Sequence, residues 1–396
     1  MATFMKTRVQ SIDILRGTIM VIMALDHVRD FFYNPTGQIA SAGLNPTNLA
    51  TTFPLLFFTR WITHFCAPIF VFLAGTSAFL VGQRKPKKEL SAFLLKRGLW
   101  LIAVEVILVT LAISFNPLYN LIFLQVIWVI GCSMIILGLL IYLPYRFILG
   151  LGLTIVFLHN TLNFIELPKS IWTDMLYSAL FSIHAYAPGR VIIFLYAIVP
   201  WSGIMMVGYG FGKLYLPAVS VAERKRKLLY MGLGLWTLFV ILRFINIYGD
   251  PLPWAVQSRG PVYTFLSFLN VSKYPPSLLF FCVTIGGGML ALRFLEGMNN
   301  GYTRVMNVFG RVPFFYYVLH FYLIHGLLVI LFYYRGYTSK DIVNPNSPFL
   351  FTPDGLGVSL LGVYIVWALV ILIMYPLCKR YNKYKSVHQQ WWLSYV

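Results

Sequence analysis

The sequence predicts an all-α, polytopic integral membrane protein with about ten transmembrane helices and both termini in the cytoplasm. Of the 396 residues, 59% are hydrophobic and only 11% are charged, which leaves too few polar side chains to cover a water-soluble globule of this size. Apolar runs of about eighteen or more residues recur along the chain, and in a bilayer such runs satisfy their backbone polar groups only as helices. The basic residues gather in the segments between these runs.

The expected spans begin close to the amino terminus. The first apolar run starts at Ile12, after Lys6 and Arg8. It is long, holds Arg16 and lacks a small-residue cleavage site, so a retained helix is favoured over a signal peptide. The ten expected spans are 12–32, 61–82, 98–115, 121–143, 147–165, 190–212, 228–247, 276–295, 312–333 and 356–378.

The distribution of lysine and arginine predicts the topology. With the amino terminus inside, each dense basic cluster falls on the cytoplasmic side, as the positive-inside rule requires. The net charge of +19 therefore reflects topology rather than nucleic-acid binding. We expect one transmembrane domain over 8–378 and a basic cytoplasmic tail over 379–396. The long, charge-poor connections at the other side are 33–60, 166–189, 248–275 and 334–355.

Cysteine spacing predicts neither disulfides nor a metal site. The four cysteines all fall within or at the ends of apolar runs, with no paired spacing. They are Cys66, Cys132, Cys282 and Cys378.

The first expected helix carries several ionisable side chains. Arg16 lies near its cytoplasmic end, and Asp26, His27 and Asp30 lie near its other end. A charge inside a span costs roughly 2.5–3.5 kcal/mol on insertion scales, so each charge needs a partner, a wet cavity or a function. His27 follows Arg16 by eleven residues, which on an α-helix returns to the same face about 16 Å further along the axis.

The face of the first helix that carries Arg16 and His27 suits acyl transfer across the membrane. The donor's phosphates need a cation, which Arg16 would supply, and its thioester needs a base or nucleophile, which His27 would supply. The structural alternative is an arginine–aspartate pair with a capped interfacial histidine. The first helix by itself leaves both interpretations open.

Two later spans place histidines at comparable depths. His64 lies at the depth of His27, which suits a shared pocket, a proton relay or a plain hydrogen bond between helices. His320 lies near the middle of 312–333, with Tyr317 on the same helical face. We expect the His27 ring to lie within about 12 Å of His64 or His320, close enough to share a small pocket.

Other polar residues have two interpretations each. Lys273 and Tyr274 precede a helix on the outer side, where Lys273 either contacts substrate or snorkels to the interface. Glu105 and Arg243 lie within expected spans and either form a structural pair or act in catalysis.

Five blocks of the sequence resemble the bacterial DUF1624 membrane proteins. The blocks are SIDILRG with a following DH, THFCAPIFVFLAG, PWSGIMMVGYGFG, NVSKYPPSLLF and GRVPFFYYVLH, and the likeness spans residues 8 to about 378. These proteins are similar to the catalytic domain of heparan-alpha-glucosaminide N-acetyltransferase, within the transmembrane acyltransferase group. The resemblance implies transfer of an acetyl or other acyl group from cytoplasmic acyl-CoA to a sugar-like acceptor on the extracytoplasmic side.

The resemblance also implies roles for residues. In the related acyltransferase-3 proteins, an arginine and a histidine separated by ten residues on a membrane helix are essential, and Arg16 and His27 match that spacing. The heparan-type enzymes carry their active histidine after the first helix, but residues 28–63 contain none here, which shifts the choice to His27. His27 is the expected general base or transient acyl acceptor, oriented by Asp26 or Asp30, and Arg16 is the donor-side cation. The candidates for substrate contacts are His64, Lys273, Tyr274 and His320.

The expected donor is acetyl-CoA or another acyl-CoA, with no metal. The expected partners are the lipid bilayer, acyl-CoA, a glycan or other small acceptor and a second copy in a homodimer, without nucleic acid. Family likeness places the protein in a bacterial inner membrane. The competing class is a proton-coupled transporter or flippase that uses the same buried charges without acyl chemistry.

Overall fold

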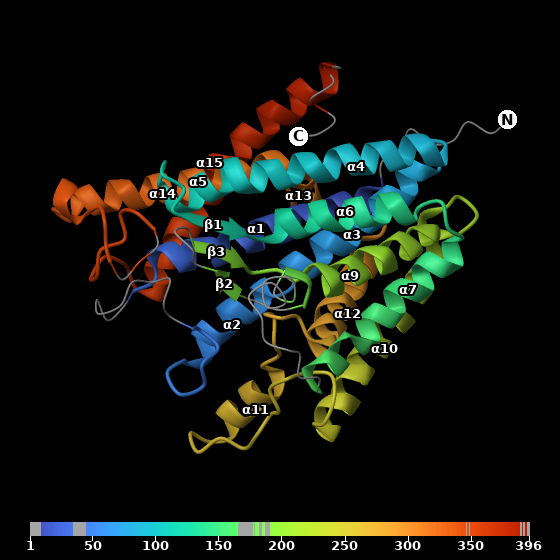
Figure 1. Cartoon of the computed structure of the whole chain (residues 1–396), viewed down its shortest axis with the longest axis horizontal. Coiled ribbons are helices and arrows are strands. Elements are labelled where there is room, and N and C mark those ends of the chain that lie inside the picture. Colours follow the sequence, from blue (N-terminus) through green and yellow to red (C-terminus); the bar gives the residue numbers. More distant parts are fainter. Residues whose placement is uncertain are drawn as a thin grey trace. The chain divides into compact units, whose positions relative to one another are not determined.

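The computed structural model describes residues 9–34, 45–164, 177, 179–181, 184–186, 191–345, 347, 349–388, 390 and 393, which are mostly helical (Figure 1). The basic start of the chain, the middle of the 33–60 connection, most of the 166–189 connection and part of the tail lie outside the described residues. The chain divides into two compact units, and each is described by itself. One comprises Met1–Leu15, Ala67–Val106 and Phe123–Met298, and the other Arg16–Cys66, Ile107–Ile122 and Asn299–Val396.

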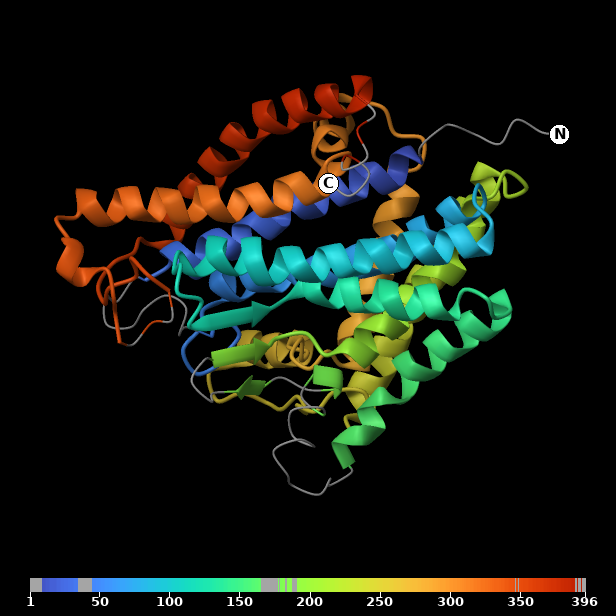
Figure 2. The same ribbon diagram turned by 45° about the horizontal axis from the view of Figure 1, so that its top comes forward.

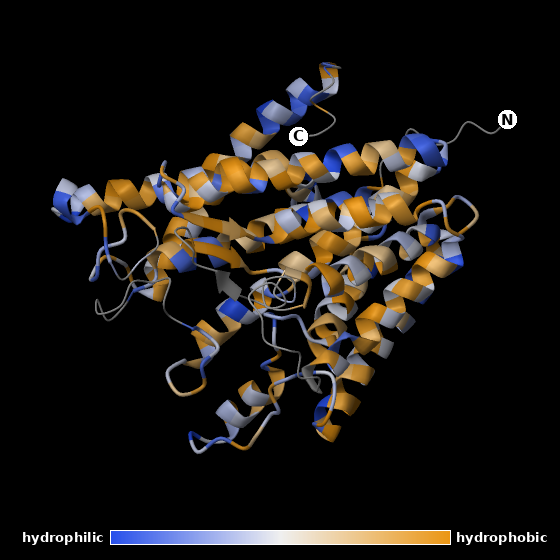
Figure 3. Ribbon diagram, viewed as in Figure 1, coloured by the Kyte–Doolittle hydropathy of each residue, from blue (hydrophilic) through white to orange (hydrophobic). Residues whose placement is uncertain are grey.

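Among the described residues, seven helices are long and apolar enough to cross a bilayer, and each overlaps one of the ten expected spans. The remaining three expected spans fall on α1 (Gln10–Phe32), which carries five aspartate and arginine residues, and on the shorter α6 (Val126–Leu140) and α9 (Ile198–Phe211). Apolar residues cover most of these helices (Figure 3). The seven are Pro54–Gly82, Lys87–Ser114, Tyr145–Leu162, Val221–Ile245, Leu278–Leu295, Pro313–Tyr334 and Leu360–Val387.

In the first unit, helices pack in pairs: α4 (Lys87–Val104) against α6, α7 (Tyr145–Leu158) against α9, and α10 (Val221–Ile245) against α12 (Leu278–Leu295). Figure 2 shows α4 and α6 running side by side, as Figure 1 does. Glycines permit this approach, because a Cβ added at Gly98 would lie 2.6 Å from the Gly131 oxygen. Among its described residues this unit also holds α3 (Cys66–Gly82), whose first residue belongs to the second unit, and α11 (Pro261–Leu269).

Three short strands correct the all-α prediction. The strands β1 (Leu121–Leu124), β2 (His184–Tyr186) and β3 (Val191–Phe194) form a sheet in the order β1-β3-β2, and β2 pairs antiparallel with β3. The spans expected at 121–143 and 190–212 are therefore wrong at their starts, where a strand precedes the helix. Short apolar runs such as these do not distinguish a buried strand from a buried helix.

The second unit holds most of α1 together with α2 (Pro54–Thr63), α5 (Thr110–Ser114), α13 (Gly301–Gly310), α14 (Pro313–Tyr334) and α15 (Leu360–Val387). α14 packs against α5, α13 and α15. α1 meets α13 at Gly17, where an added Cβ would lie 1.9 Å from the Met306 oxygen. α15 continues past residue 378 to Val387, so the basic tail expected from 379 begins inside a helix.

Candidate active site

The helix that carries His64 is broken at that residue. α2 ends at Thr63 and α3 begins at Cys66. In a continuous helix, Pro68 would lack a donor and its ring would clash with the carbonyl of His64. The His64 N–H bonds instead to the Trp61 carbonyl at 3.0 Å, and the side chain is buried. His64 thus occupies the turn between the two helical segments.

A buried cluster of charges joins α1 to α2. The Asp26 carboxylate lies 2.6 Å from the Arg29 guanidinium, accepts from the Thr63 hydroxyl at 2.8 Å and accepts from Arg60. Arg29 also donates to Asp30. Two carboxylates and two guanidiniums thereby compensate one another, three of them from α1 and Arg60 from α2.

Sequence reasoning found the acidic members of this cluster and missed Arg60 and Thr63. The available signal was an arginine at the start of the expected second span, with a threonine one turn later. Asp26 and Asp30 both contact arginine here. Their role in orienting His27 stays a prediction.

The structure brings His27 on α1 and His320 on α14 together. Their ring centroids are 5.3 Å apart, and Phe321 lies against both rings, 4.3 Å from His27 and 4.4 Å from His320. The prediction that His27 would lie within about 12 Å of another intramembrane histidine is confirmed for His320. The prediction that Tyr317 and His320 share a helical face is confirmed too, with 5.7 Å between their rings.

The backbone of α14 fixes the tautomer of His320. Nδ1 lies 3.1 Å from the Tyr316 carbonyl and 2.5 Å from the Tyr317 carbonyl. Because a carbonyl only accepts hydrogen bonds, Nδ1 must carry the proton, so Nε2 of a neutral ring bears a lone pair. The ring is fully buried, and Nε2 has no hydrogen-bond partner in the part of the chain that the structure describes. The backbone of α14 therefore fixes the orientation of the His320 ring beside His27.

His325, one and a half turns further along α14, has different surroundings. Its ring stacks on Phe115 at 3.7 Å, and its nitrogens lie 3.2 Å from the Ala112 carbonyl and 3.0 Å from the Leu350 carbonyl. Both nitrogens thus face protein acceptors. His325 is a packing residue that links α14 to α5 and to the 349–358 segment.

Arg16 and His27 lie on one unbroken helix. α1 is α-helical from Gln10 to Phe32, so the eleven steps from Arg16 to His27 rise about 16 Å and return to the same face. Arg16 is half-buried. α13 packs beside it at Gly17, and Thr18 contacts the Tyr302 hydroxyl.

Lys273 and Tyr274 form a second cluster, in the first unit. The Lys273 ammonium lies 4.9 Å from the centre of the Tyr274 ring, and the Tyr274 hydroxyl donates to the Tyr196 hydroxyl at 3.3 Å. Lys273 is buried and Tyr274 half-buried. His159, the C-cap residue of α7, contacts the Pro276 carbonyl at 2.8 Å and so ties this loop to α7. Sequence reasoning missed both Tyr196 and His159.

Arg243 and Asp250 brace this loop. The Arg243 guanidinium donates to four backbone carbonyls at 2.7–2.9 Å and lies 4.0 Å from Asp250. Asp250 accepts from the Ser277 hydroxyl at 2.6 Å and the Ser272 N–H at 2.9 Å. Burial raises the pKa of the Asp250 carboxyl, and these hydrogen bonds only partly oppose the rise.

Of the two interpretations of Glu105 and Arg243, the structural pair is wrong, because Arg243 contacts Asp250 and backbone carbonyls instead. Glu105 is fully buried in the first unit and accepts the Gln125 N–H at 3.0 Å. Gln125 is the N-cap of α6, where the helix dipole favours a carboxylate. This geometry indicates a structural role for Glu105.

A family model described as "Heparan-alpha-glucosaminide N-acetyltransferase, catalytic" matches residues 8–245, which is more than half of the chain. The chain belongs to this family. The N-acetyltransferase match covers Arg16, Asp26, His27 and His64 and ends with α10, before His320. No curated protein matches the chain. Membership and the seven apolar helices together indicate an integral membrane protein of an N-acetyltransferase family.

Proposed function

We propose that the protein transfers an acetyl or other acyl group from cytoplasmic acyl-CoA to a sugar-like acceptor on the opposite side of a bacterial inner membrane. The observation that carries this proposal is the contact between His27 and His320, whose Nε2 bears a free lone pair. Buried polar groups are costly unless satisfied, and such exceptions concentrate at functional sites. An imidazole pair of this kind suits proton transfer to and from an attacking nucleophile.

In the proposed reaction, His27 takes the proton of the acceptor's amine or hydroxyl as that group attacks the thioester carbonyl. The C–S bond breaks, and the CoA thiolate leaves and takes up the proton that His27 received from the acceptor. The His320 ring lies 5.3 Å from His27, and its Nε2 lone pair offers a second acceptor for that proton. In a two-step version a His27 nitrogen attacks the thioester first and then passes the acyl group to the acceptor.

Arg16 is the proposed cation for the donor's phosphates. It shares a face of α1 with His27 at about 16 Å, a span suited to a pantetheine arm that reaches inward from phosphates at the cytoplasmic surface. This placement requires the amino-terminal end of α1 to face the cytoplasm. We accordingly propose ten crossings with both termini inside, in which α1, α6 and α9 join the seven apolar helices.

His64, Lys273 and Tyr274 are proposed acceptor contacts. Lys273 and Tyr274 offer a cation and an aromatic ring of the kind that binds sugars or their anionic substituents. His64 sits at a helix break beside the Asp26 cluster. The proposal also takes the acceptor to be a glycan or another small molecule and the protein to be a homodimer.

The test is kinetic, with purified protein in nanodiscs, labelled acetyl-CoA and a panel of amino sugars. His27→Ala should lower kcat by roughly 10²–10⁴-fold, the usual contribution of a general base, while acetyl-CoA binding stays near wild type. Arg16→Gln should weaken acetyl-CoA binding roughly ten- to a hundredfold, as expected for loss of a charged hydrogen bond.

The matched control is His388→Ala, because His388 is an exposed histidine at the end of α15. It should leave both parameters unchanged. If a well-folded His27→Ala protein transfers acetyl groups at a near-normal rate, the catalytic assignment is wrong.

The competing proposal is a proton-coupled transporter or flippase. The Asp26–Arg29–Arg60 cluster favours it, since buried carboxylates paired with arginine also occur in proton pathways. Thioester cleavage decides between the two classes. A transporter would leave acetyl-CoA intact at every acceptor concentration while still moving substrate or protons across vesicles.

A further inference from the structure

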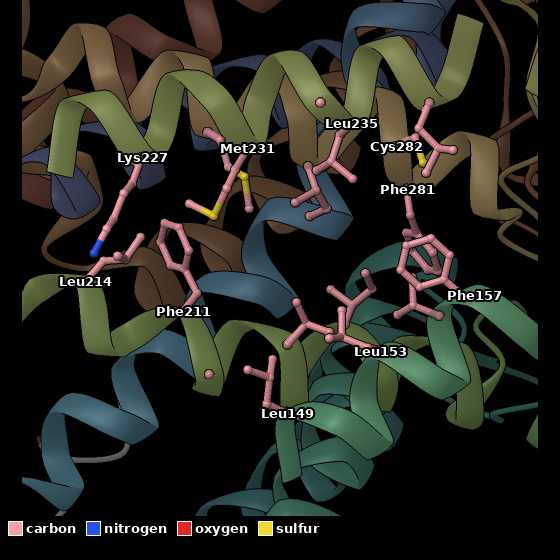
Figure 4. Close-up of a pocket in the computed structure, with 18 of the residues that line it drawn as sticks. Leu149, Leu153, Phe157, Phe211, Leu214, Lys227, Met231, Leu235, Phe281 and Cys282 are labelled. Carbon is pink, nitrogen blue, oxygen red and sulfur yellow. The ribbon is translucent and has the colours of Figure 1, made fainter. Parts of the chain in front are cut away.

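A cavity of about 740 Å³ lies in the first unit among α7, α9, α10 and α12 (Figure 4). Each helix lines the cavity with residues from one of its faces. α7 contributes Tyr145, Leu149 and Phe157, and α10 contributes Lys227 and Leu238, together with residues between them. Intervals of four, eight and eleven residues return to the same helical face. The groove therefore runs lengthwise between the helices.

The groove is polar at one end only. Lys213 and Lys227 are the charged residues among those that line it, and both lie at the end where Tyr145 begins α7. Figure 4 shows Lys227 beside Leu214 at one end of the groove and Phe157 with Cys282 at the other. The occupant must accordingly be an amphiphile with an anionic head.

The length of the groove matches one leaflet. Lys227 and Leu238 are eleven residues apart on α10, which corresponds to about 16 Å, and Tyr145 and Phe157 are about 18 Å apart on α7. The hydrocarbon core of a bilayer is about 30 Å thick. Only 28% of the apolar stretch in Tyr145–Leu162, which includes α7, and 22% of that in α10 are buried. These walls therefore face lipid, and a bilayer component can enter from the side.

We propose that this groove binds one anionic phospholipid of the surrounding bilayer. At least one of its two acyl chains lies along the apolar stripes, and the phosphate accepts hydrogen bonds from Lys213 and Lys227. The Lys213 ammonium already lies 5.2 Å from the Tyr145 ring centre, and Lys227 pairs with Glu223 at 2.6 Å, so both amines are held near the mouth. Glu223 balances only one of the two cations, so an anionic headgroup supplies a negative charge that a lipid without net charge does not. A water-soluble anion would leave the apolar length unfilled.

Two variants test the site, each with a matched control. Gly234 lines the groove, and a Cβ added there meets no atom within 4 Å, so Gly234→Leu fills the groove without displacing its walls. Gly150 on α7 has equally open space but does not line the groove, which makes Gly150→Leu the control. The double variant Lys213→Gln/Lys227→Gln removes the charges, and Arg226→Gln removes a neighbouring cation outside the groove.

The measurement is native mass spectrometry of full-length protein titrated with phosphatidylglycerol or phosphatidylcholine of identical chains. We expect the wild type to prefer phosphatidylglycerol, the double lysine variant to lose roughly tenfold or more of that binding, and Gly234→Leu to lose binding of both lipids. The Gly150 and Arg226 controls should bind as the wild type does.

Three results would overturn the proposal: equal binding of the two lipids by the wild type, wild-type binding by the lysine or Gly234 variants, or displacement of lipid by acetyl-CoA. The last result would assign the groove to the donor instead. Lipid binding and acyl transfer are measured separately, so the failure of one proposal leaves the other testable.

Discussion

The contact between α3 and α9 predicts a cost for the smallest substitution there. A Cβ added at Gly208 would lie 2.0 Å from the Phe72 carbonyl oxygen, whereas ordinary van der Waals contact begins at 3.4 Å, so the helices must separate by at least 1.4 Å. The Thr76 hydroxyl donates to the Gly208 carbonyl at 3.0 Å, and this bond would be broken. Both helices carry blocks of the family-like sequence, THFCAPIFVFLAG and PWSGIMMVGYGFG.

The magnitude follows from three effects. Overpacking costs typically about 1–3 kcal/mol, and the lost hydrogen bond costs about 0.5–1.5 kcal/mol. Replacing glycine by alanine in a helix returns about 0.5–1 kcal/mol. We therefore expect Gly208→Ala to lower the free energy of unfolding by about 1–3 kcal/mol.

The assay is a reversible titration with sodium dodecyl sulfate in mixed micelles, followed by circular dichroism. Gly234→Ala is the matched control, because its new Cβ meets no atom within 4 Å. It should be neutral or stabilising by about 0.5–1 kcal/mol. If Gly208→Ala unfolds like the wild type, the close approach of α3 and α9 does not exist and the reasoning is refuted.

Four further predictions concern other parts of the chain. His320→Asn, which can keep a donor near the Nδ1 position but lacks Nε2, should lose most of the transfer rate while remaining folded; full activity would exclude Nε2 from the chemistry. Arg243→Met should lower the free energy of unfolding by about 3–5 kcal/mol, because it strands a buried carboxylate; a wild-type titration curve would contradict this. Burial raises the pKa of Asp250 above 3.8, so the folded state holds this proton to higher pH than the unfolded state does. The contribution of Asp250 to the free energy of unfolding therefore falls as pH rises from 3.8 through the folded pKa. Asp250→Asn should reduce this dependence of the unfolding free energy on pH, and an unchanged dependence would count against the reasoning. Cysteines placed at Arg84 and Val256 should label from opposite sides of sealed vesicles, and labelling of both from one side would sink the proposed topology.

Sequence patterns predicted the helices better than the contacts among them. Apolar runs located each of the seven long apolar helices in the described part of the chain, since bilayer thickness and backbone satisfaction leave few alternatives. They failed at 121–124 and 191–194, where strands precede α6 and α9. A four-residue apolar run satisfies its backbone equally well in a buried strand, so composition could not separate the two.

For the candidate site too, the sequence predicted positions along a helix better than contacts between helices. The spacing of Arg16 and His27 follows from helical geometry alone, and the structure keeps α1 unbroken between them. The approach of His320 to His27 could be expected only as a matter of depth, because which face of α14 meets α1 depends on packing. The partners of Asp26 on α2 were not foreseen for the same reason.

By itself, the sequence determined that this chain belongs in a membrane, where its seven long apolar helices lie, and which ionisable residues fall inside apolar runs. These properties depend on transfer free energies and helical periodicity, which act residue by residue along the chain. Only the tertiary structure decided that Arg243 serves Asp250 and not Glu105, that His320 carries its proton on Nδ1, and that four helices leave a groove with lysines at one end. Those outcomes depend on which helical faces pack together, because a side chain's partners are set by neighbours far away in sequence.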